Sequence, residues 1–303
     1  MLSTTPVTAP AALLARAQGR PRVRALIVGA DHPVAMESAR LGTDAGLIEP
    51  VLIGALPRMA ELAENSGWDI AAFTQIDASG DAALADAAAV LAPDPAIQMV
   101  MKGQIHTDAL MAALLRREAG IRIGKRLSHI FHMTVGESAP LLISDGALNV
   151  APDMKTLQAI AENLVTLSGM IGLEAPKIAC LSASEEVLPQ MPSSVAAGDL
   201  ASWANAQGWP AAFHGPLAFD NAVSPEAAAL KRLSGPVAGQ ADALLVPSIE
   251  VGNALFKMMV YFMGACAAGV VMGGRIPIVI TSRADPPEAR LASAALAALV
   301  ASV

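Results

Sequence analysis

The stretch ALIVGADHPVAMESARLGTDA, residues 25–45, contains the pattern that decides the fold. It begins with the apolar run Ala25–Gly29, continues through a polar turn that holds Asp31 and His32, and ends in a helical pattern over Val34–Ala45. A continuous apolar run is typical of a parallel strand with helices on both faces, because such a strand has no polar side. The stretch therefore predicts a buried strand followed by a helix.

The same order recurs along the chain. Further apolar runs end in polar or glycine-containing turns at 51–54, 97–101, 140–143, 177–181, 243–246 and 276–281. Helical patterns, mostly rich in alanine, stand before, between and after these runs, at 10–18, 34–45, 81–91, 108–118, 154–168, 194–207, 225–233, 254–269 and 288–301. This alternation predicts an α/β fold with a mostly parallel sheet. Ligands of such folds bind beyond the carboxyl ends of the strands, so the polar residues after each run are the candidates for a site.

Composition excludes several classes of protein. The 303 residues are 54% apolar and 16% charged, with a net charge of −7, which excludes a disordered chain and disfavours a nucleic-acid-binding one. Two cysteines, Cys180 and Cys266, cannot form a disulfide framework, and both are expected to be small buried residues, Cys266 within a helix. A reducing, cytoplasmic location is therefore predicted.

One segment requires a membrane test. Met258–Gly274 carries no charge over 17 residues, the lower limit for a spanning helix. Its glycines divide it into a buried helix and a Gly-Gly turn before the run at 276–281, so no membrane association is expected.

Three of the turns carry charges suited to anions. Ser282-Arg283-Ala284-Asp285 follows a strand directly, where a guanidinium can hold a phosphate and a carboxylate can take a proton. Lys102-Gly103 also ends a strand, and Val251-Gly252-Asn253-Ala254 with Lys257 has the pattern of a glycine turn into a helix. Taken alone, each is a weak signal, because ordinary turns and helix starts contain the same residues. No metal is expected, because His129 and His132 have no further ligands at suitable spacing. The glycine-rich motifs of nucleotide-binding proteins are also missing from the sequence.

Six blocks of the sequence, taken together, resemble the phosphate acetyltransferase and phosphate butyryltransferase family. They run in the family's order from about residue 99 to the C-terminus: Met101–Thr107, Ser128-His129, Ser144–Asp153, Gly215–Ser224, Ala241–Lys257 and Thr281–Asp285. Six blocks in order are far more specific than one short motif. The chain before Met99 shares only the general strand–helix character.

The resemblance implies a reaction, in which acyl-CoA and phosphate give acyl phosphate and CoA. It implies no cofactor, with coenzyme A as a substrate. It also implies a homodimer of chains with two α/β domains, the active cleft between them, and a fold shared with isocitrate and isopropylmalate dehydrogenases. The domains are expected at 1–127 plus 286–303 and at 128–285.

The resemblance also implies site residues. Arg283 would hold the phosphate, Ser282 would hydrogen-bond the reacting carbonyl or thiol, and Asp285, or else Glu288, would be the base. Substrate-binding residues are expected at Lys102, Ser128, His129, Asp145, Asn149, Asn253 and Lys257. The chain departs from the acetyltransferase branch at Met111, where that branch has an arginine, and this leans slightly toward the butyryltransferase branch.

Two other functions stay open at this point. One is a metal- and NAD-dependent hydroxy-acid dehydrogenase of the same broad fold, although it would need clustered aspartates that the sequence lacks. The other is a catalytically weakened partner domain, since the departures from the family pattern could mark lost activity. The acyl group, acetyl or butyryl, is also open.

Overall fold

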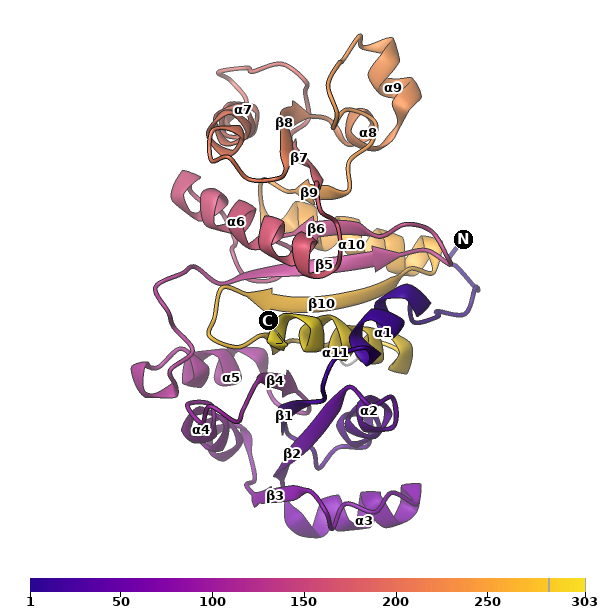
Figure 1. The fold of residues 1–303 in the computed structure, drawn as a ribbon, viewed down its shortest axis with the longest axis vertical. Helices are drawn as coiled ribbons and strands as arrows, with labels where there is room; N and C mark the ends of the chain where they lie inside the picture. Colours follow the sequence, from indigo (N-terminus) through magenta and orange to yellow (C-terminus); the bar gives the residue numbers. More distant parts are fainter. Residues whose placement is uncertain (283, 303) are drawn as a thin grey trace. The chain divides into compact units, whose positions relative to one another are not determined.

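The computed structural model of the protein describes residues 1–282 and 284–302. Contacts within the chain divide it into two compact units, which are described separately (Figure 1). Unit 1 comprises Met1–Pro6 and Arg126–Ala267, and unit 2 comprises Val7–Lys125 together with the chain from Ala268 onward.

Unit 2 contains a sheet in the strand order β3-β2-β1-β4-β11-β10. Strands β1 to β4 and β11 run parallel, and β10 is antiparallel to β11. The predicted run at 25–29 lies in β1, at the centre of this sheet, and its residues from Ala25 to Val28 are fully buried. The strands are β1 (Val23–Val28), β2 (Ile48–Gly54), β3 (Thr74–Asp77), β4 (Met99–Lys102), β10 (Cys266–Met272) and β11 (Ile278–Val279).

Helices cover both faces of this sheet. In Figure 1, α4 and α5 lie on one side and α1, α2 and α11 on the other. His32 caps α2, since its Nδ1 accepts a hydrogen bond from the backbone N–H of Val34 at 3.3 Å, and Pro33 occupies the first turn. The helices are α1 (Ala11–Gln18), α2 (Pro33–Asp44), α3 (Leu56–Ser66), α4 (Asp81–Leu91), α5 (Thr107–Leu114), a 3-10 turn (Arg117–Ala119) and α11 (Pro287–Ala301).

Unit 1 contains the strand order β5-β6-β9-β7-β8. Strands β5 and β6 are antiparallel, while β6, β9, β7 and β8 are parallel, as the alternation of runs and helices predicts. The strands are β5 (Ser128–Thr134), β6 (Leu141–Ser144), β7 (Lys177–Leu181), β8 (Ala212–Leu217) and β9 (Ala243–Leu245).

The helices of unit 1 also lie on both sides of its strands. Figure 1 shows α6 and α7 on one side and α8, α9 and α10 on the other. The helices expected at 154–168 and 225–233 begin where the sequence predicts, because a side chain caps each one: Asp153 accepts from the N–H of Thr156 at 2.8 Å, and Ser224 from that of Ala227 at 3.2 Å. The helices are α6 (Met154–Met170), α7 (Pro192–Asn205), α8 (Phe219–Val223), α9 (Pro225–Leu230) and α10 (Ile249–Met263).

The segment Met258–Gly274 folds differently from the prediction. Helix α10 ends at Met263, Gly264 adopts the left-handed conformation with φ 67°, and the chain continues as strand β10. A glycine ends a helix in this way because it has no side chain to strain. The predicted helix over 254–269 is therefore wrong in its second half, and Cys266 lies in a buried strand. The helical part of Met258–Gly274 is not buried as expected either, since Met258, Tyr261, Phe262 and Met263 are about half-exposed.

Strands β3, β5 and β8 and helix α3 have no counterpart in the prediction. Their sequences, such as TQID in β3 and SHIFHMT in β5, mix polar and apolar residues and lack a continuous apolar run. The predicted domain boundary at 286 also differs from the return to unit 2 at Ala268, because β11 pairs with β4 and β10 pairs with β11. The domain organisation of the working protein stays a prediction.

The three tryptophans are divided between the two units. Trp68 packs against Phe73 in unit 2, with ring centroids 5.5 Å apart. Trp203 and Trp209 pack against each other in unit 1 at 5.4 Å, in an edge-to-face arrangement. Among the residues that the structure describes, none of the helices combines the length and apolar character that crossing a bilayer requires.

Candidate active site

A cavity of about 310 Å³ opens at the carboxyl ends of strands in unit 2, and we call it the cationic pocket. The strand register brings its residues together, because Val28 of β1 pairs with Lys102 of β4, and Val279 of β11 pairs with Met101. The pocket is lined by His32, Val34, Ala35, Ser38, Lys102, Gly103, Gln104, Thr281, Ser282 and Arg290. Two predicted site residues, Lys102 and Ser282, thus line one cavity.

The floor of the cationic pocket depends on close backbone packing. A Cβ atom on Gly103 would lie 2.6 Å from the carbonyl oxygen of Gly29 and 2.8 Å from the Cβ of Ala35, so only glycine fits. Lys102 is 9% exposed, and its Nζ donates to the carbonyl of Gly103 at 3.4 Å. Thr281 joins the two strand ends, since its Oγ1 donates to the carbonyl of Lys102 at 3.3 Å.

Arg290 is a residue of this pocket that sequence reasoning missed. It stands on α11, whose buried residues are otherwise Ala, Leu and one Ser, and it is only 4% exposed. Burial lowers the pKa of its guanidinium, while the carboxylates of Asp285 and Glu37 oppose that shift. A buried cation is costly unless it is compensated, so an arginine in a helix face of alanines was a detectable signal. The pocket therefore holds two buried cations in a protein of net charge −7.

Ser282 and Asp285 form a compact turn at the edge of the pocket. The backbone N–H of Ser282 donates to Asp285 Oδ2 at 2.7 Å, and the N–H of Ala284 donates to Ser282 Oγ at 3.3 Å. Burial raises the pKa of Asp285 above its ordinary value, although Arg290 and Lys102 act in the other direction. A carboxyl with a raised pKa is a better proton acceptor. Arg283, the residue expected to hold phosphate, lies outside the described residues.

Two positions bear on the departures from the family pattern. Glu288, the second choice for the base, lies in the first turn of α11 and is partly buried. Met111, the residue where the resemblance implies an arginine in the acetyltransferase branch, is a buried residue of α5 and 8% exposed. The nearby Arg116 is exposed and pairs with Asp86 at 2.6 Å.

The predicted residues Asp145 and Asn149 lie together in unit 1, after β6. Asp145 Oδ1 accepts from the N–H groups of Ala147 at 2.8 Å and Leu148 at 2.9 Å. Its Oδ2 accepts from the N–H of His129 at 3.0 Å and from Asn149 Nδ2 at 2.7 Å. With four donors on a carboxylate that is 2% exposed, Asp145 fixes the shape of the loop after β6.

Arg126 is a second residue that the sequence prediction left out. Its Nε donates to Asn149 Oδ1 at 3.0 Å, and the residue is exposed. Its backbone carbonyl accepts from Asn163 Nδ2 at 3.0 Å, and the same amide donates to Ser128 Oγ at 2.9 Å. This cation thus stands beside the loop that Asp145 holds.

Ser128 and His129 are fully buried in β5. Burial lowers the pKa of His129 to about 4, although Asp145 opposes the shift, so the ring is neutral at pH 7. The ring of His129 packs edge-on against that of Phe131, with ring centroids 4.3 Å apart. The ring of Phe131 stacks on that of Phe256 in α10, with centroids 4.1 Å apart. His132, also in β5, has its pKa lowered to about 4 by burial.

Asn253 does not stand where the prediction placed it. Helix α10 begins at Ile249 after Ser248, so Asn253 lies inside the helix and the expected glycine turn at its start is wrong, while Lys257 lies within the helix as expected. Gly252 instead permits close packing, because a Cβ there would lie 2.7 Å from the carbonyl oxygen of Asp145. Asn253 Nδ2 donates to the carbonyl of Gly146 at 3.5 Å, and Lys257 is exposed.

Comparisons with known proteins agree on one family. The profile of the family described as "Phosphate acetyl/butaryl transferase" matches residues 82–298. A "Phosphate acetyltransferase" of Rhizobium meliloti is 40% identical over 269 residues, covering 88% of this chain and 84% of the relative. A "Phosphate butyryltransferase" of Clostridium acetobutylicum is 36% identical over 279 residues, covering 91% and 92%.

The fold agrees with the same family. The crystal structure of "a branched-chain phosphotransacylase from Enterococcus faecalis V583" superposes with a TM-score of 0.80 at 32% identity, over 92% of this chain and 99% of that one. These neighbours do not support the expected likeness to isocitrate and isopropylmalate dehydrogenases, and the dehydrogenase alternative is not favoured. From the profile, the relatives and the fold together, the chain belongs to the phosphate acetyltransferase and phosphate butyryltransferase family.

Proposed function

We propose that this protein transfers a short acyl group reversibly between coenzyme A and inorganic phosphate. The observation that carries the proposal is the cationic pocket, which places Lys102, Arg290 and Ser282 around one cavity in a chain of this family. Inorganic phosphate and acyl phosphate are anions, and two buried cations at the end of a parallel sheet supply the charge that binds them. The names of the two relatives, phosphate acetyltransferase and phosphate butyryltransferase, refer to transfer of an acyl group and phosphate.

The proposed chemistry needs a base, a carbonyl partner and a phosphate partner. Asp285 takes the proton from the thiol of CoA, and the thiolate sulfur attacks the carbonyl carbon of the acyl phosphate. The new carbon–sulfur bond forms as the carbon–oxygen bond to phosphate breaks, and the phosphate leaves with the electron pair. Arg283, with Lys102, stabilises that phosphate, and Ser282 donates a hydrogen bond to the carbonyl or thiol.

Other features of the proposal come from the resemblance. The substrate-binding roles of Ser128, His129, Asp145, Asn149, Asn253 and Lys257 stay predictions, with Asp145 acting through the loop that it holds. The absence of a cofactor, the cytoplasmic location and an active cleft between two domains are also predictions. Asp285 stays the first choice for the base, because its pKa is raised and it lies within electrostatic reach of Lys102 and Arg290.

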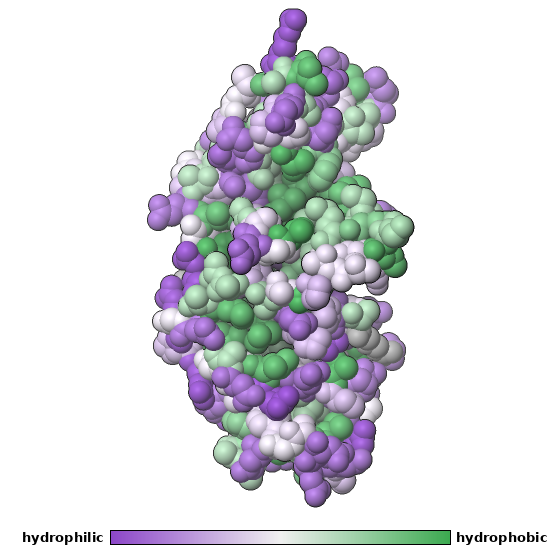
Figure 2. Space-filling model, turned by 90° about the vertical axis from the view of Figure 1, so that its right-hand side faces the viewer, coloured by the Kyte–Doolittle hydropathy of each residue, from purple (hydrophilic) through white to green (hydrophobic). Residues whose placement is uncertain are grey.

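A homodimer is proposed through the exposed face of α10. Met258, Tyr261, Phe262 and Met263 are large apolar residues that are about half-exposed on this one helix. Figure 2 shows the face on the right-hand side of Figure 1, where hydrophobic areas lie between hydrophilic ones. Contiguous exposed apolar residues mark association surfaces. Light scattering of the wild type and of Phe262→Glu tests the proposal: a dimer that becomes monomeric supports it, and a wild-type monomer contradicts it.

The activity is tested by mixing the protein with CoA and either acetyl phosphate or butyryl phosphate and following thioester absorbance. The wild type is expected to form thioester, and Arg283→Ala is expected to lose about 10²–10³ of the rate, the usual loss when one charge-stabilising donor is removed. Arg20→Ala, which removes an exposed arginine outside the pocket, is the matched control. If no short acyl phosphate yields thioester, the transferase proposal fails and a catalytically weakened domain is favoured.

A further inference from the structure

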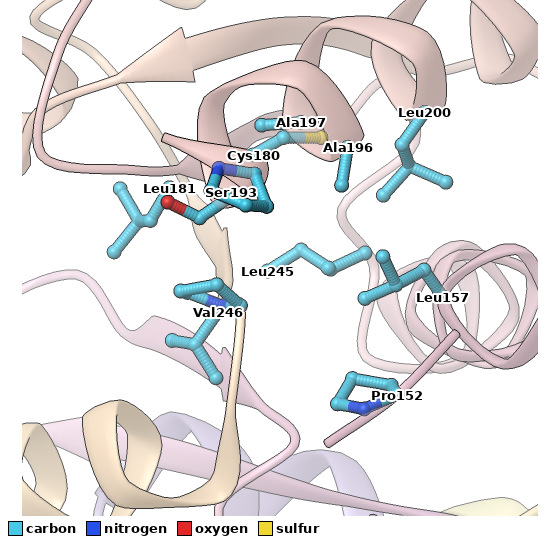
Figure 3. Close-up of a pocket in the computed structure, with 12 residues that line it drawn as sticks. Pro152, Leu157, Cys180, Leu181, Ser193, Ala196, Ala197, Leu200, Leu245 and Val246 are labelled. Carbon is cyan, nitrogen blue, oxygen red and sulfur yellow. The ribbon is translucent and has the colours of Figure 1, made fainter. Parts of the chain in front are cut away.

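A second cavity, in unit 1, plays no part in the chemistry described so far, and we call it the apolar pocket. It has a volume of about 230 Å³ and is lined by Pro152, Leu157, Cys180, Leu181, Pro192, Ser193, Ala196, Ala197, Leu200, Leu245, Val246 and Pro247 (Figure 3). It lies at the carboxyl ends of β7 and β9, where Cys180, the residue before the last of β7, pairs with Leu245, the last residue of β9. This is the position where α/β sheets bind ligands.

The lining is apolar and carries no charge. Figure 3 shows Ala196 and Leu200 projecting from α7 toward Leu157 of α6, with Pro152 on the same wall as Leu157. The one side-chain hydroxyl in the lining belongs to Ser193, and it is already hydrogen-bonded to Ser182 Oγ at 2.9 Å. Burial raises the pKa of the Cys180 thiol to about 12, so this group is a neutral thiol at pH 7. The pocket therefore suits neither an anion nor a metal ion.

The pocket is neither a sealed void nor a flat surface. Its wall residues Leu157, Leu181, Leu200, Leu245 and Val246 are buried. Three prolines of the lining are accessible to solvent, with Pro192 exposed and Pro152 and Pro247 partly so. A mouth of prolines is rigid, since each ring fixes its backbone φ. A small apolar ligand segment can enter without a large rearrangement.

The size limits the occupant. A dry apolar cavity of about 150 Å³ accommodates benzene, so about 230 Å³ corresponds to a chain of a few carbons beyond that. It is smaller than the roughly 300–1,000 Å³ of pockets for complete drug-sized ligands. An unbranched or branched acyl chain of about four to six carbons matches both the volume and the lining.

The mouth adjoins the loop that Asp145 holds. Pro152 stands three residues after Asn149, and Pro247 follows β9, next to the hydrogen bond between the N–H of Ile249 and the carbonyl of Val150 at 3.0 Å. We infer that the apolar pocket binds the aliphatic chain of the acyl group, so that the enzyme prefers acyl groups of four or more carbons to acetyl. This inference rests on the proposed transferase function and specifies its substrate.

The preference has an expected size. Each buried methylene contributes about 0.8 kcal/mol, so the two methylenes that distinguish butyryl from acetyl favour butyryl by roughly tenfold in kcat/KM. The wild type is therefore assayed with acetyl, propionyl, butyryl, isobutyryl and valeryl phosphate at fixed CoA. Formation of any thioester supports the function itself, whereas the ranking of the substrates tests the pocket.

Filling the pocket provides the decisive variants. Ala196 projects into the cavity and is partly buried, so Ala196→Val and Ala196→Leu reduce its volume stepwise. We expect the kcat/KM ratio of butyryl to acetyl phosphate to fall about tenfold or more in Ala196→Leu and by less in Ala196→Val, with acetyl transfer kept. Ala206→Leu adds the same atoms at the exposed C-terminal end of α7, outside the lining, and is expected to keep the wild-type ratio.

Three results would overturn the inference while leaving the function intact. The first is a wild-type enzyme that transfers acetyl at least as well as butyryl. The second is an Ala196 series in which the chain-length ratio does not change. The third is an Ala196→Leu variant whose KM for CoA rises equally with every acyl phosphate, which would place the pantetheine arm of CoA in the pocket. Circular dichroism of each variant shows whether a lost activity is only lost folding.

Discussion

The cationic pocket and the apolar pocket occupy equivalent places in the two units and differ in chemistry. Both open at the carboxyl ends of parallel strands, with helices alongside. In unit 2 the strand ends carry Lys102 and Thr281, and α11 adds Arg290, whereas in unit 1 they carry Cys180, Leu181 and Val246. The sheet thus fixes where a ligand binds, and the few residues after each strand decide which part of the ligand it is. The cationic pocket suits a phosphate, and the apolar pocket suits an alkyl chain.

The largest expected effect comes from removing charge from the cationic pocket. Arg290→Met keeps much of the side-chain volume but removes the guanidinium, and we expect kcat/KM for acyl phosphate to fall by about 10²–10³. The ratio of butyryl to acetyl transfer should stay as in the wild type, because the apolar pocket is untouched. Steady-state kinetics with both substrates measure the two quantities.

Two further variants decide what Arg290 does. Arg290→Lys keeps a positive charge and should recover part of the affinity for phosphate, while Arg20→Met removes an exposed arginine and should change neither quantity. Thermal unfolding of each variant separates lost charge from lost stability. Near-native phosphate affinity in a folded Arg290→Met would contradict the role of this residue in the pocket.

Acid is expected to destabilise unit 1 through its two buried histidines. Burial lowers the pKa of His132 to about 4 and that of His129 to about 4, both in β5 of unit 1. The unfolded chain binds these protons near pH 6.5, so the stability contributed by the neutral rings is present above that pH and is lost as the pH falls toward 4. The loss amounts to about 3 kcal/mol for each histidine.

The measurement is the free energy of unfolding in urea at about pH 7.5, 6 and 5. His132→Gln has no titrating ring at this position, so the decrease in its unfolding free energy from pH 7.5 to pH 5 should be smaller than in the wild type by about 2 kcal/mol. Each pH is compared with the wild type at the same pH, which cancels other titrating groups. An equal decrease in both proteins would show that His132 does not stay neutral in the folded state.

A smaller effect is expected from a matched pair of glycines. In Gly103→Ala the new methyl group meets the backbone of Gly29, so we expect a loss of about 1–3 kcal/mol in unfolding free energy and weaker phosphate binding. Gly169→Ala places the same methyl group in open space within α6 and should stabilise the protein by about 0.5–1 kcal/mol. Urea unfolding measures both, and equal effects would contradict the close packing beneath the cationic pocket.

The sequence predicted the parts of the fold that repeat a simple pattern. Continuous apolar runs located β1, β2, β4, β6, β7, β9 and β11, and the helical patterns at 154–168 and 225–233 located the starts of α6 and α9. Mixed strands such as β5 were missed, because a strand with buried histidines has no continuous apolar run. The helix expected through Cys266 was wrong, because apolar content alone does not distinguish a helix end from a buried strand.

The site was predictable only where a motif or a strand end marked it. Lys102 and Ser282 follow strands and line one pocket, whereas Arg290 lies seven residues after Arg283 in an alanine-rich helix and was not selected. Asn253 was assigned to the turn before a helix because the start of α10 was placed too late. The apolar pocket could not be predicted at all, since its lining comes from α6, α7, β7 and β9, and no local pattern joins them.

The separation of the tryptophans makes the protein its own optical reporter. Trp68 emits from unit 2 alone, while Trp203 and Trp209 emit from unit 1. Replacing Trp68 with Phe leaves a signal from unit 1, and replacing both Trp203 and Trp209 leaves a signal from unit 2. Fluorescence can then report which unit senses phosphate, which senses the acyl chain, and which loses its structure first in acid.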